Sequence, residues 1–401
     1  MCREEQTLKQ HCEICTGCGR CRNADAAYCI VTKSPLQRAF VEQPDCVNAD
    51  VVIADIGTTT VAMQLIDAGG RVKDTFLKVN PQIKYGADVL SRILAAEDKI
   101  VAEDMRRMID AVLQEGLAKF YSKAADKSKL KMVLAGNMTM IYLLMGYEPS
   151  KLGKAPFTVE HGEGGMIEFQ GVPCYIVPGI SAFVGGDIVA GAYAAGMFET
   201  DEMTLLIDLG TNGELILGNR EKRLACSTAA GPAFDGGAGK GIWGADMVSI
   251  AATLLKEQIM DETGLLKEPY FEDGIRVGSV EVTQQDIRNL QLAKAAVATG
   301  IELLSEEYGI NREEIDRVVL AGGLGYYLKS EDAVAIGLLP ESLMHKTVTG
   351  GNTALAGAAR LAFSENYTLL HQAAKKTEII NLAQMERFQD LFLQNIQFIA
   401  I

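Results

Sequence analysis

The chain has 401 residues, of which 48% are apolar and 22% charged, and its net charge at pH 7 is −14. This length is enough for two substantial hydrophobic cores and a small appendage. The acidic balance argues against nucleic acid as a partner, because phosphate backbones are bound by clusters of Lys and Arg. It does not exclude a nucleotide, whose phosphates are commonly held by backbone N–H groups and Mg²⁺. With no run near the ~18 apolar residues that span a bilayer, and no apolar secretory signal, we expect a cytoplasmic protein without a membrane partner.

The first block, residues 1–49, is polar and rich in cysteine. It holds seven of the nine cysteines of the chain: Cys2, Cys12, Cys15, Cys18, Cys21, Cys29 and Cys46. Four of them form the run C-E-I-C-T-G-C-G-R-C, in which two residues separate each cysteine from the next. A disulfide framework is not expected in a chain without a secretion signal. Zinc normally uses two separated pairs of ligands rather than one tight run.

Iron–sulfur chemistry fits this run better, because short C-x-x-C spacings wrap a compact cluster and Gly17 and Gly19 permit the wrap. We therefore predict a cluster of the [4Fe–4S] type, with zinc and free thiols as alternatives. The ferredoxin run differs, since three residues precede its fourth cysteine and a proline follows it. The fourth ligand stays open between Cys21, Cys29 and Cys46, and the other predicted ligands are Cys12, Cys15 and Cys18.

An internal repeat organises the rest of the chain. Residues 51–66 read VVIADIGTTTVAMQLI and residues 204–219 read TLLIDLGTNGELILGN. Farther along, MVLAGN at 132–137 matches VVLAGG at 318–323, and GGDIVAGAYAAG from Gly185 matches GGNTALAGAARLA from Gly350. Three elements recur in the same order, which predicts a duplicated domain with copies at 50–200 and 201–361.

Helical patterns lie between the matched elements. Residues 86–123 and 284–308 are amphipathic at helical spacing, so each copy combines strands with helices. This alternation indicates an α/β fold with mixed sheets flanked by helices. In the tail, residues 362–401, we expect helix that packs on the body through a stripe of Phe388, Leu391, Phe392, Ile396 and Ile399.

Two further features are expected to be structural. Cys174 and Cys226 stand alone in apolar or small-residue surroundings and are expected to be buried. Residues 226–245 are dense in glycine and are expected to form a loop under the second phosphate motif that changes shape with nucleotide. Within that loop, Lys240 either meets a phosphate or is a solvated loop lysine, and the second interpretation is favoured.

The two Asp-x-Gly-Thr turns can bind phosphate. A strand ends at Asp55, Gly57 lets the backbone turn sharply, and the N–H groups and hydroxyls that follow can face phosphate oxygens. The carboxylate of Asp55 suits Mg²⁺ or its water shell. The segment from Asp208 to Gly213 offers the same chemistry from the opposite side, so the two turns form a phosphate clamp.

These motifs resemble the superfamily of actin, sugar kinases and heat-shock chaperone ATPases. The resemblance implies an actin-like, ribonuclease H-like fold that binds ATP and Mg²⁺ between two lobes. It assigns the nucleotide to three motifs: Asp55, Gly57, Thr58 and Thr59; Asp208, Gly210, Thr211 and Asn212; and, at the adenosine, Gly322, Gly323 and Leu324. The small-residue helices after Gly186 and Gly351 resemble the two connecting helices that cross at the hinge.

Asp187 begins the first of these connecting helices. In sugar kinases an Asp at a comparable place acts as base, and here it could orient a hydrolytic water near the γ-phosphate, with Asp55 and Asp208 completing the catalytic set. An N-cap is the other interpretation, because Asp is favoured there.

The longer motifs DIGTTTVAMQLID, LAGNMTM, PGISAFVGGDIVAG and STAAGPAFDGGAGKGIWGA resemble the ATPase domain of the reductive activators of corrinoid proteins. The match spans about residues 50–400. It implies that ATP binding or hydrolysis is coupled to electron delivery from an iron–sulfur centre, which reduces Co(II) corrinoid to Co(I). Expected partners are a corrinoid methyl-carrier protein and an electron donor; a homodimer is a further expectation. Such activators typically carry a full ferredoxin-like domain, whereas 49 residues precede the first phosphate strand here.

Two rival functions remain at this point. A small-metabolite kinase would transfer the γ-phosphate to a hydroxylated acceptor with Asp187 as base, but it leaves the cysteine run unexplained. A non-catalytic ATP-dependent scaffold or sensor would close its cleft around a partner without hydrolysis.

Overall fold

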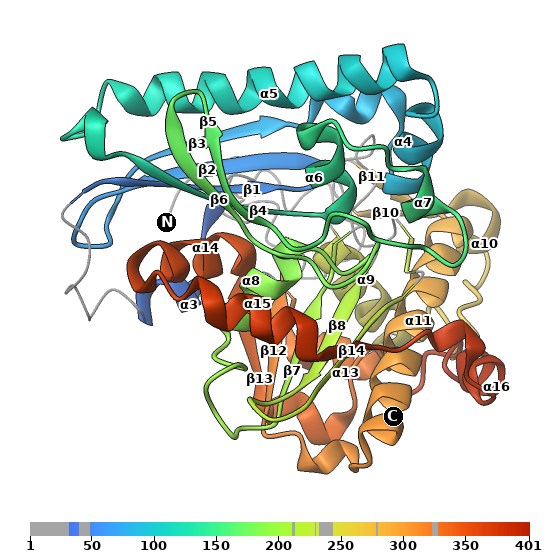
Figure 1. Cartoon of the computed structure of the whole chain (residues 1–401). Helices are drawn as coiled ribbons and strands as arrows, with labels where there is room; N and C mark the ends of the chain where they lie inside the picture. The colour runs from blue at the N-terminus through green and yellow to red at the C-terminus, as the bar shows by residue number, and fades with distance from the viewer. Residues whose placement is uncertain are drawn as a thin grey trace, which may run out of the picture.

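The computed structural model describes residues 32–39, 49–210, 213–228, 230–231, 244–277, 280–322 and 328–401. Its two lobes are built around six-stranded mixed sheets, and helices lie between the sheets and outside them (Figure 1). The run Cys12–Cys21, Lys240 and most of the glycine-dense loop lie outside the described residues.

The first sheet has the strand order β3-β2-β1-β4-β6-β5. Strands β1, β4 and β6 run parallel, while β2, β3 and β5 are antiparallel to their neighbours. The strand bounds are β1 (Val51–Ile56), β2 (Thr60–Ile66), β3 (Val72–Val79), β4 (Lys131–Gly136), β5 (Gly165–Phe169) and β6 (Val172–Ile176).

The second sheet has the order β13-β12-β7-β8-β9-β14 and repeats five strands of the first, whereas its sixth strand, β14, pairs in parallel with β9 at the opposite edge from β5. Its parallel strands β7, β12 and β13 correspond to β1, β4 and β6, and the antiparallel strands β8 and β9 correspond to β2 and β3. The bounds are β7 (Thr204–Asp208), β8 (Glu214–Gly218), β9 (Arg223–Ser227), β12 (Arg317–Ala321), β13 (Thr347–Gly351) and β14 (Thr377–Ile379). The predicted duplication and α/β fold class are confirmed.

Alternation along the strands explains the layering, because successive side chains of a strand point to opposite faces. In β7, Leu205 and Ile207 join an outer core with α9 (Gly244–Lys256) and α11 (Gln284–Tyr308). Leu206, between them, joins a core shared by both lobes. In the first sheet, β1 likewise sends alternate residues to the shared core and to an outer core under α5 (Lys99–Tyr121) (Figure 1).

The two predicted helical segments are present. Residues 284–308 form α11, which begins with a capping box between Thr283 and Asp286. The segment 86–123 holds two helices, α4 (Val89–Ala95) and α5, because Asp98 caps a second start. Further helices of the described residues are α3 (Pro35–Ala39), α6 (Met138–Met145), α7 (Ser150–Gly153), α10 (Tyr270–Asp273) and α13 (Ser330–Ala335), and the short strands β10 (Ile275–Val277) and β11 (Val280–Val282) pair antiparallel.

The connecting helices α8 (Gly186–Ala194) and α14 (Thr353–Ser364) pack on each other between the two sheets (Figure 1). Small residues make this possible, since a Cβ on Gly357 would overlap the carbonyl oxygen of Ala190. The close crossing expected from the sequence is confirmed.

The tail differs in part from the helix expected for it. It holds α15 (Tyr367–Lys376) and α16 (Phe388–Gln394), but β14 between them pairs with β9 at the edge of the second sheet. Leu391 and Phe398 are buried in the outer core, so the tail packs on the body as predicted. Ile399, expected on the packing stripe, follows the end of α16 and is 43% exposed.

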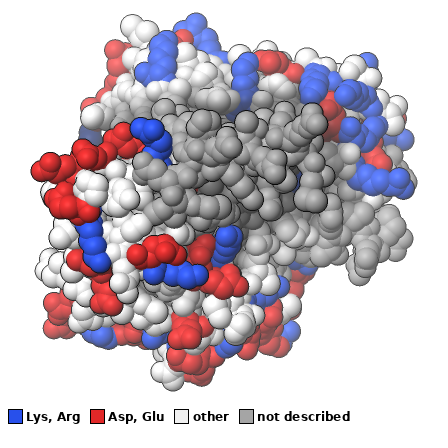
Figure 2. Space-filling view, turned by 180° about the vertical axis from the view of Figure 1, so that it is seen from behind, with Lys and Arg blue, Asp and Glu red and all other residues white. Residues whose placement is uncertain are grey.

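Figure 2 shows Lys, Arg, Asp and Glu side chains interspersed around the margin of one face of the molecule. In the described part of the chain, no helix is both long and apolar enough to cross a bilayer.

Candidate nucleotide site

The first phosphate turn joins β1 to β2. The N–H of Gly57 donates to the carbonyl of Thr60 at 2.9 Å, which closes the turn. A Cβ on Gly57 would lie 3.0 Å from the same carbonyl oxygen, so this tight turn favours glycine. Thr58 is buried and Thr59 is exposed, so only the second of the two hydroxyls is freely accessible to solvent.

Asn80, which the sequence analysis did not single out, holds this turn in place. Its side-chain amide donates to the carbonyl of Gly57 at 2.9 Å, and its backbone N–H donates to the carbonyl of Thr59 at 2.8 Å. Its side-chain oxygen accepts from the N–H of Gln82 at 3.0 Å and so caps a short 3₁₀ helix, Pro81–Tyr85. Asn followed by Pro is a typical helix start, so the pair Asn80-Pro81 was the sequence signal that could have revealed this cap.

The second phosphate turn follows β7. Asp208 ends the strand and Gly210 follows, whereas Thr211 and Asn212 lie outside the described residues. Beyond the turn, Gly213 has a positive φ of 75°, and its carbonyl accepts from the N–H and hydroxyl of Thr228 at 2.8 and 3.0 Å. The far side of the turn is therefore anchored to the residue that follows β9.

The predicted adenosine motif adjoins this second turn. Gly322 directly follows β12 and has a φ of 78°. A Cβ there would lie 2.6 Å from Oδ1 of Asp208 and 2.9 Å from the carbonyl oxygen of Leu209. Glycine is therefore required both by the backbone and by the close approach to the phosphate strand. Gly323 and Leu324 lie outside the described residues.

Three carboxyl groups from three elements gather between the lobes: Asp55 at the end of β1, Asp187 in the first turn of α8 and Asp208 at the end of β7. Burial, together with the nearby charge of Asp187, raises the pKa of Asp55 to about 7 and the pKa of Asp208 to about 8. Burial also raises the pKa of Asp187 to about 6. Buried like charges of this kind create a strong demand for a cation.

Asp187 does not cap α8, because Gly185 is the N-cap and Asp187 is the second helical residue. Its Oδ1 accepts from the N–H of Ile188 at 2.9 Å. A Cβ on Gly185 would lie 2.8 Å from that same oxygen, so the carboxylate packs against the backbone before the helix. The capping interpretation is thus wrong, and the catalytic role of Asp187 stays a prediction.

Asn352 is the second functional candidate that the sequence analysis missed. Its amide Nδ2 donates to Oδ2 of Asp55 at 2.8 Å, and its Oδ1 caps α14 by accepting from the N–H of Leu355. The repeat contained a signal, since Gly185-Gly186-Asp187 matches Gly350-Gly351-Asn352. The two lobes therefore contribute an acidic and an amide side chain from equivalent positions.

The donor set fits Mg²⁺ bound together with a nucleotide. In the described part of the chain, no three His, Cys, Asp or Glu side chains converge closely enough to form a metal site by themselves. Mg²⁺ typically keeps several waters and uses one or two carboxylates together with substrate phosphates, so a complete protein cage is not required. Asp55 and Asp208, each at the edge of a phosphate turn, are placed to meet a hydrated cation of this kind.

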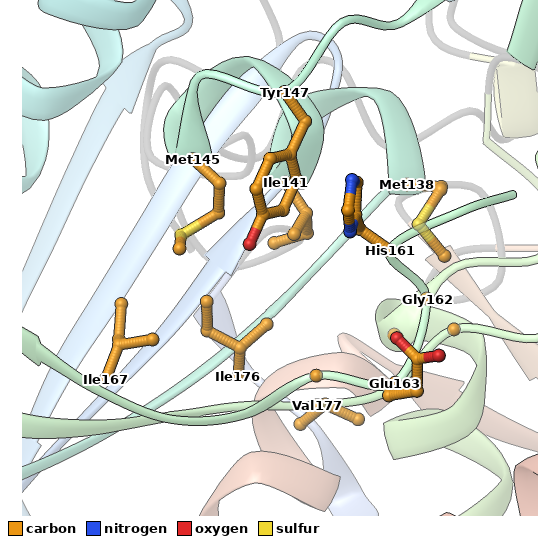
Figure 3. Close-up of a pocket in the computed structure, with 13 residues that line it drawn as sticks. Met138, Ile141, Met145, Tyr147, His161, Gly162, Glu163, Ile167, Ile176 and Val177 are labelled. Carbon is orange, nitrogen blue, oxygen red and sulfur yellow. The ribbon is translucent and has the colours of Figure 1, made fainter. Parts of the chain in front are cut away.

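A pocket of about 90 Å³ lies in the first lobe next to this site (Figure 3). Gly186, the neighbour of Asp187, is among its lining residues. His161 stacks on Tyr147 with ring centroids 4.1 Å apart, and Glu163 is a further lining residue (Figure 3). Six further lining residues are Met, Ile or Val, so the pocket combines apolar side chains with the polar groups of Tyr147, His161 and Glu163.

The two isolated cysteines are buried as predicted, and neither belongs to the site. Burial raises the pKa of the Cys174 thiol to about 12, so it is an inert packing residue. The predicted cluster ligands Cys12, Cys15, Cys18 and Cys21, and the alternatives Cys29 and Cys46, lie outside the described residues.

Comparison with known proteins agrees with this geometry. The model of the RACo middle region matches residues 51–200, and the model of the C-terminal domain of RACo, the ASKHA domain, matches residues 202–240 and 238–400. The chain belongs to the RACo family. ASKHA denotes the actin, sugar-kinase and heat-shock ATPase fold, so the fold expected from the repeat is confirmed.

Individual relatives of the family support the same assignment. A solved structure, the reductive activator for corrinoid, iron–sulfur protein, matches with a TM-score of 0.76 and 30% identity, covering 88% of this chain and 67% of that one. The corrinoid activation enzyme RamQ of Eubacterium limosum is 29% identical over 416 residues, covering 86% of this chain and 69% of RamQ. The [Co(II) methylated amine-specific corrinoid protein] reductase of Methanosarcina barkeri is 24% identical over 56% of this chain and 52% of its own length.

Proposed function

We propose that this protein is an ATP-dependent reductive activator, which uses ATP to drive a low-potential electron onto a Co(II) corrinoid protein and so restores the Co(I) state. The observation that carries the proposal is that this RACo-family chain brings Asp55, Asp187 and Asp208 close enough together for the charge of Asp187 to raise the pKa of the other two. Co(II) reduction is uphill for ordinary donors, so a change of state driven by ATP is needed to shift the equilibrium.

In this proposal, the first turn holds phosphate through Gly57, Thr58 and Thr59, and the second through Gly210, Thr211 and Asn212. Gly322, Gly323 and Leu324 approach the adenosine. Asp55 and Asp208 hold hydrated Mg²⁺, which neutralises phosphate charge when bound. Asp187 orients the hydrolytic water, for which its place at the N-terminal turn of α8 is suited.

We assign the electron-carrying centre to the cysteine-rich segment, residues 1–49. The run from Cys12 to Cys21 supplies four thiolates at short spacing, which suits an iron–sulfur cluster of the [4Fe–4S] type. The cytoplasm is the proposed location, because thiols stay reduced there. A corrinoid protein and an electron donor are the proposed partners, and a homodimer is the proposed assembly. The names of RamQ and of the corrinoid protein reductase support the corrinoid partner.

The metabolite-kinase alternative is less well supported. It leaves the cysteine run from Cys12 to Cys21 unexplained, and the chain belongs to the RACo family. A pure scaffold would not need three carboxyl groups whose pKa values are raised together.

The decisive experiment is anaerobic reconstitution of the full chain with iron and sulfide, followed by spectroscopy with and without Mg-ATP and a Co(II) corrinoid protein. We expect a brown protein that converts Co(II) to Co(I) only when ATP is present. Changing Cys12, Cys15 and Cys18 to Ser should abolish the cluster spectrum, whereas Cys174→Ser should retain it. A colourless protein that binds zinc, or phosphate transferred to a small acceptor, would overturn the proposal.

Single changes of the remaining cysteines identify the fourth ligand. Cys21→Ser, Cys29→Ser and Cys46→Ser are compared by iron content and electron paramagnetic resonance after the same reconstitution. The variant that loses cluster iron carries the fourth ligand, and the other two serve as controls for each other.

A further inference from the structure

Residues 32–37, which we name the strap, cross from one lobe to the other. On the first lobe, Gln64 of β2 donates through Nε2 to the carbonyl of Thr32 at 2.6 Å and accepts from Nε2 of Gln37 at 3.0 Å. On the second lobe, the hydroxyl of Ser34 donates to the carbonyl of Gly350 at 2.5 Å. The strap therefore has hydrogen bonds to both halves of the duplicated fold.

These contacts are built into the protein interior. Thr32, Ser34 and Gln64 are all buried, with 2%, 6% and 3% of their surface exposed. Gly351 has a φ of 63°, and a Cβ there would overlap the carbonyl oxygen of Lys33. The second lobe therefore requires glycine at position 351, because the backbone of the strap passes too close for a side chain.

Asn352 joins the strap to the nucleotide site. Its backbone N–H donates to the carbonyl of Lys33 at 3.0 Å, and its side-chain amide donates to Oδ2 of Asp55 at 2.8 Å. Both bonds start from the residue that caps α14, one of the two hinge helices. A shift of this helix start therefore displaces the strap and the carboxylate together.

The strap lies directly after most of the cysteines of the N-terminal segment in the chain. Cys29, the last cysteine before the strap, precedes Thr32 by three residues. A nucleotide bound between the lobes sets their separation, and a segment bonded to both lobes must respond when that separation changes.

We propose that the strap couples the nucleotide state of the site at Asp55 to the run Cys12–Cys21, which precedes it in the chain, with Asn352 as the residue that positions both Asp55 and the strap. This inference rests on the proposed function and adds the route by which nucleotide binding reaches the electron-carrying segment. Because coupling between two sites is reciprocal, a change in the strap must alter nucleotide affinity by the factor by which nucleotide stabilises the strap.

Hydrogen exchange on the full, reconstituted chain tests this coupling directly. The backbone N–H of Gln37 donates to the carbonyl of Ser34, and that of Asn352 donates to the carbonyl of Lys33. The exchange rates of these two N–H groups therefore report the stability of the strap. We expect their exchange to slow about tenfold on addition of a non-hydrolysable ATP analogue with Mg²⁺, with binding verified by calorimetry in the same sample. The cluster's electron paramagnetic resonance spectrum should change with nucleotide as well.

Two conservative variants provide the reciprocal test. Ser34→Ala removes the bond to Gly350, and we expect it to weaken analogue binding about fivefold and to abolish the nucleotide response of the cluster spectrum. Ser305→Ala is the matched control, because it also removes a buried hydroxyl that donates to a backbone carbonyl, that of Ile301 at 2.8 Å. Its affinity should stay within about twofold of the native protein.

The possible failures are distinguishable. If the analogue binds normally while exchange at Gln37 and Asn352 is unchanged, or if Ser34→Ala behaves like Ser305→Ala, the coupling is overturned and the proposed function survives. If the native chain binds no nucleotide, the coupling and the proposed function both fail.

Discussion

Gly357 of α14 lies against Ala190 of α8 with no room between them for a side chain, since a Cβ on Gly357 would overlap the Ala190 carbonyl oxygen. Gly191 meets the other helix in a similar way, because a Cβ there would lie 2.7 Å from Oγ1 of Thr353. The two helices, one from each half of the repeat, therefore cross backbone against backbone. A contact of this kind keeps the crossing point in place while the angle between the lobes changes, as a hinge requires.

Replacing Gly357 with Ala should destabilise the protein by about 1–3 kcal/mol, because a backbone carbonyl cannot move aside as a side chain can. Gly116→Ala in α5 is the matched control, since the nearest atoms there belong to the flexible side chain of Met63. Both substitutions raise helix propensity by a similar amount, so the difference between their unfolding free energies measures the cost of a side chain at the helix crossing. Urea unfolding measures it, and equal stabilities for the two variants would contradict the tight crossing.

Changing Asp55 or Asp208 to Asn should weaken Mg-ATP binding about tenfold or more, which is about 1.4 kcal/mol per factor of ten. Metal-free ATP should bind the same variants as well as or better than the native protein, because a carboxylate repels phosphate. Isothermal titration calorimetry with and without Mg²⁺ separates these effects. Asp261→Asn is the control, since the Asp261 carboxylate accepts hydrogen bonds from Thr263 and Leu265 of its own loop in the second lobe. Unchanged Mg-ATP affinity in both site variants would disprove this placement of the cation.

Asn80→Ala should loosen the first phosphate turn. The side chain is fully buried and makes one bond to the Gly57 carbonyl and one to the Gln82 N–H, so its loss should cost about 1–3 kcal/mol of unfolding free energy. ATP affinity should fall as well, because the turn is no longer held at Gly57. Asn80→Asp keeps the acceptor for Gln82 but not the donor, so it should retain the 3₁₀ helix and still lose affinity. Normal ATP binding by the Asp variant would show that the bond to Gly57 is dispensable.

The fold was predictable because the same sequence motifs occur in the same order in both halves of the chain. The paired Asp-x-Gly-Thr turns and Gly-rich helix starts occupy equivalent places in two sheets that share the order of five strands. The helix at 284–308 was recovered with its bounds, since a capping box and a regular apolar stripe define it locally. The strand β14 could not be foreseen, because its three residues gain stability only by pairing with β9 at a sheet edge.

The candidate site was only partly predictable for a related reason. Asp55, Asp187 and Asp208 belong to recognisable motifs, but their mutual effect on pKa arises when three distant segments meet. Asn352 and Asn80 act on Asp55 and Gly57 from 297 and 23 residues away, so sequence spacing does not reveal either contact. The match of Asn352 to Asp187 in the repeat was a signal for one of them.

The three aspartates should make the metal-free protein less stable as the pH rises. Their pKa values in the folded protein, about 7, 6 and 8 for Asp55, Asp187 and Asp208, lie above the ordinary value of 3.8. Folding therefore favours the protonated carboxyls, and the stability they contribute is complete below about pH 4 and is lost progressively as the pH rises from there through the folded pKa values of 6 to 8. We expect a loss of about 4 kcal/mol between pH 6 and 8.5, or about 5 °C in Tm.

Mg-ATP should reduce this loss, because a bound cation replaces the protons, and its affinity should rise over the same pH range. Thermal unfolding at a series of pH values, with and without Mg-ATP, measures both effects. Asp187→Asn removes the charge that raises the pKa of Asp55 and of Asp208, so its metal-free stability should decline at lower pH and depend less on pH above 6. A native protein whose stability is flat from pH 6 to 8.5, or one that this substitution leaves unchanged, would show that the three carboxyl groups do not share one electrostatic site.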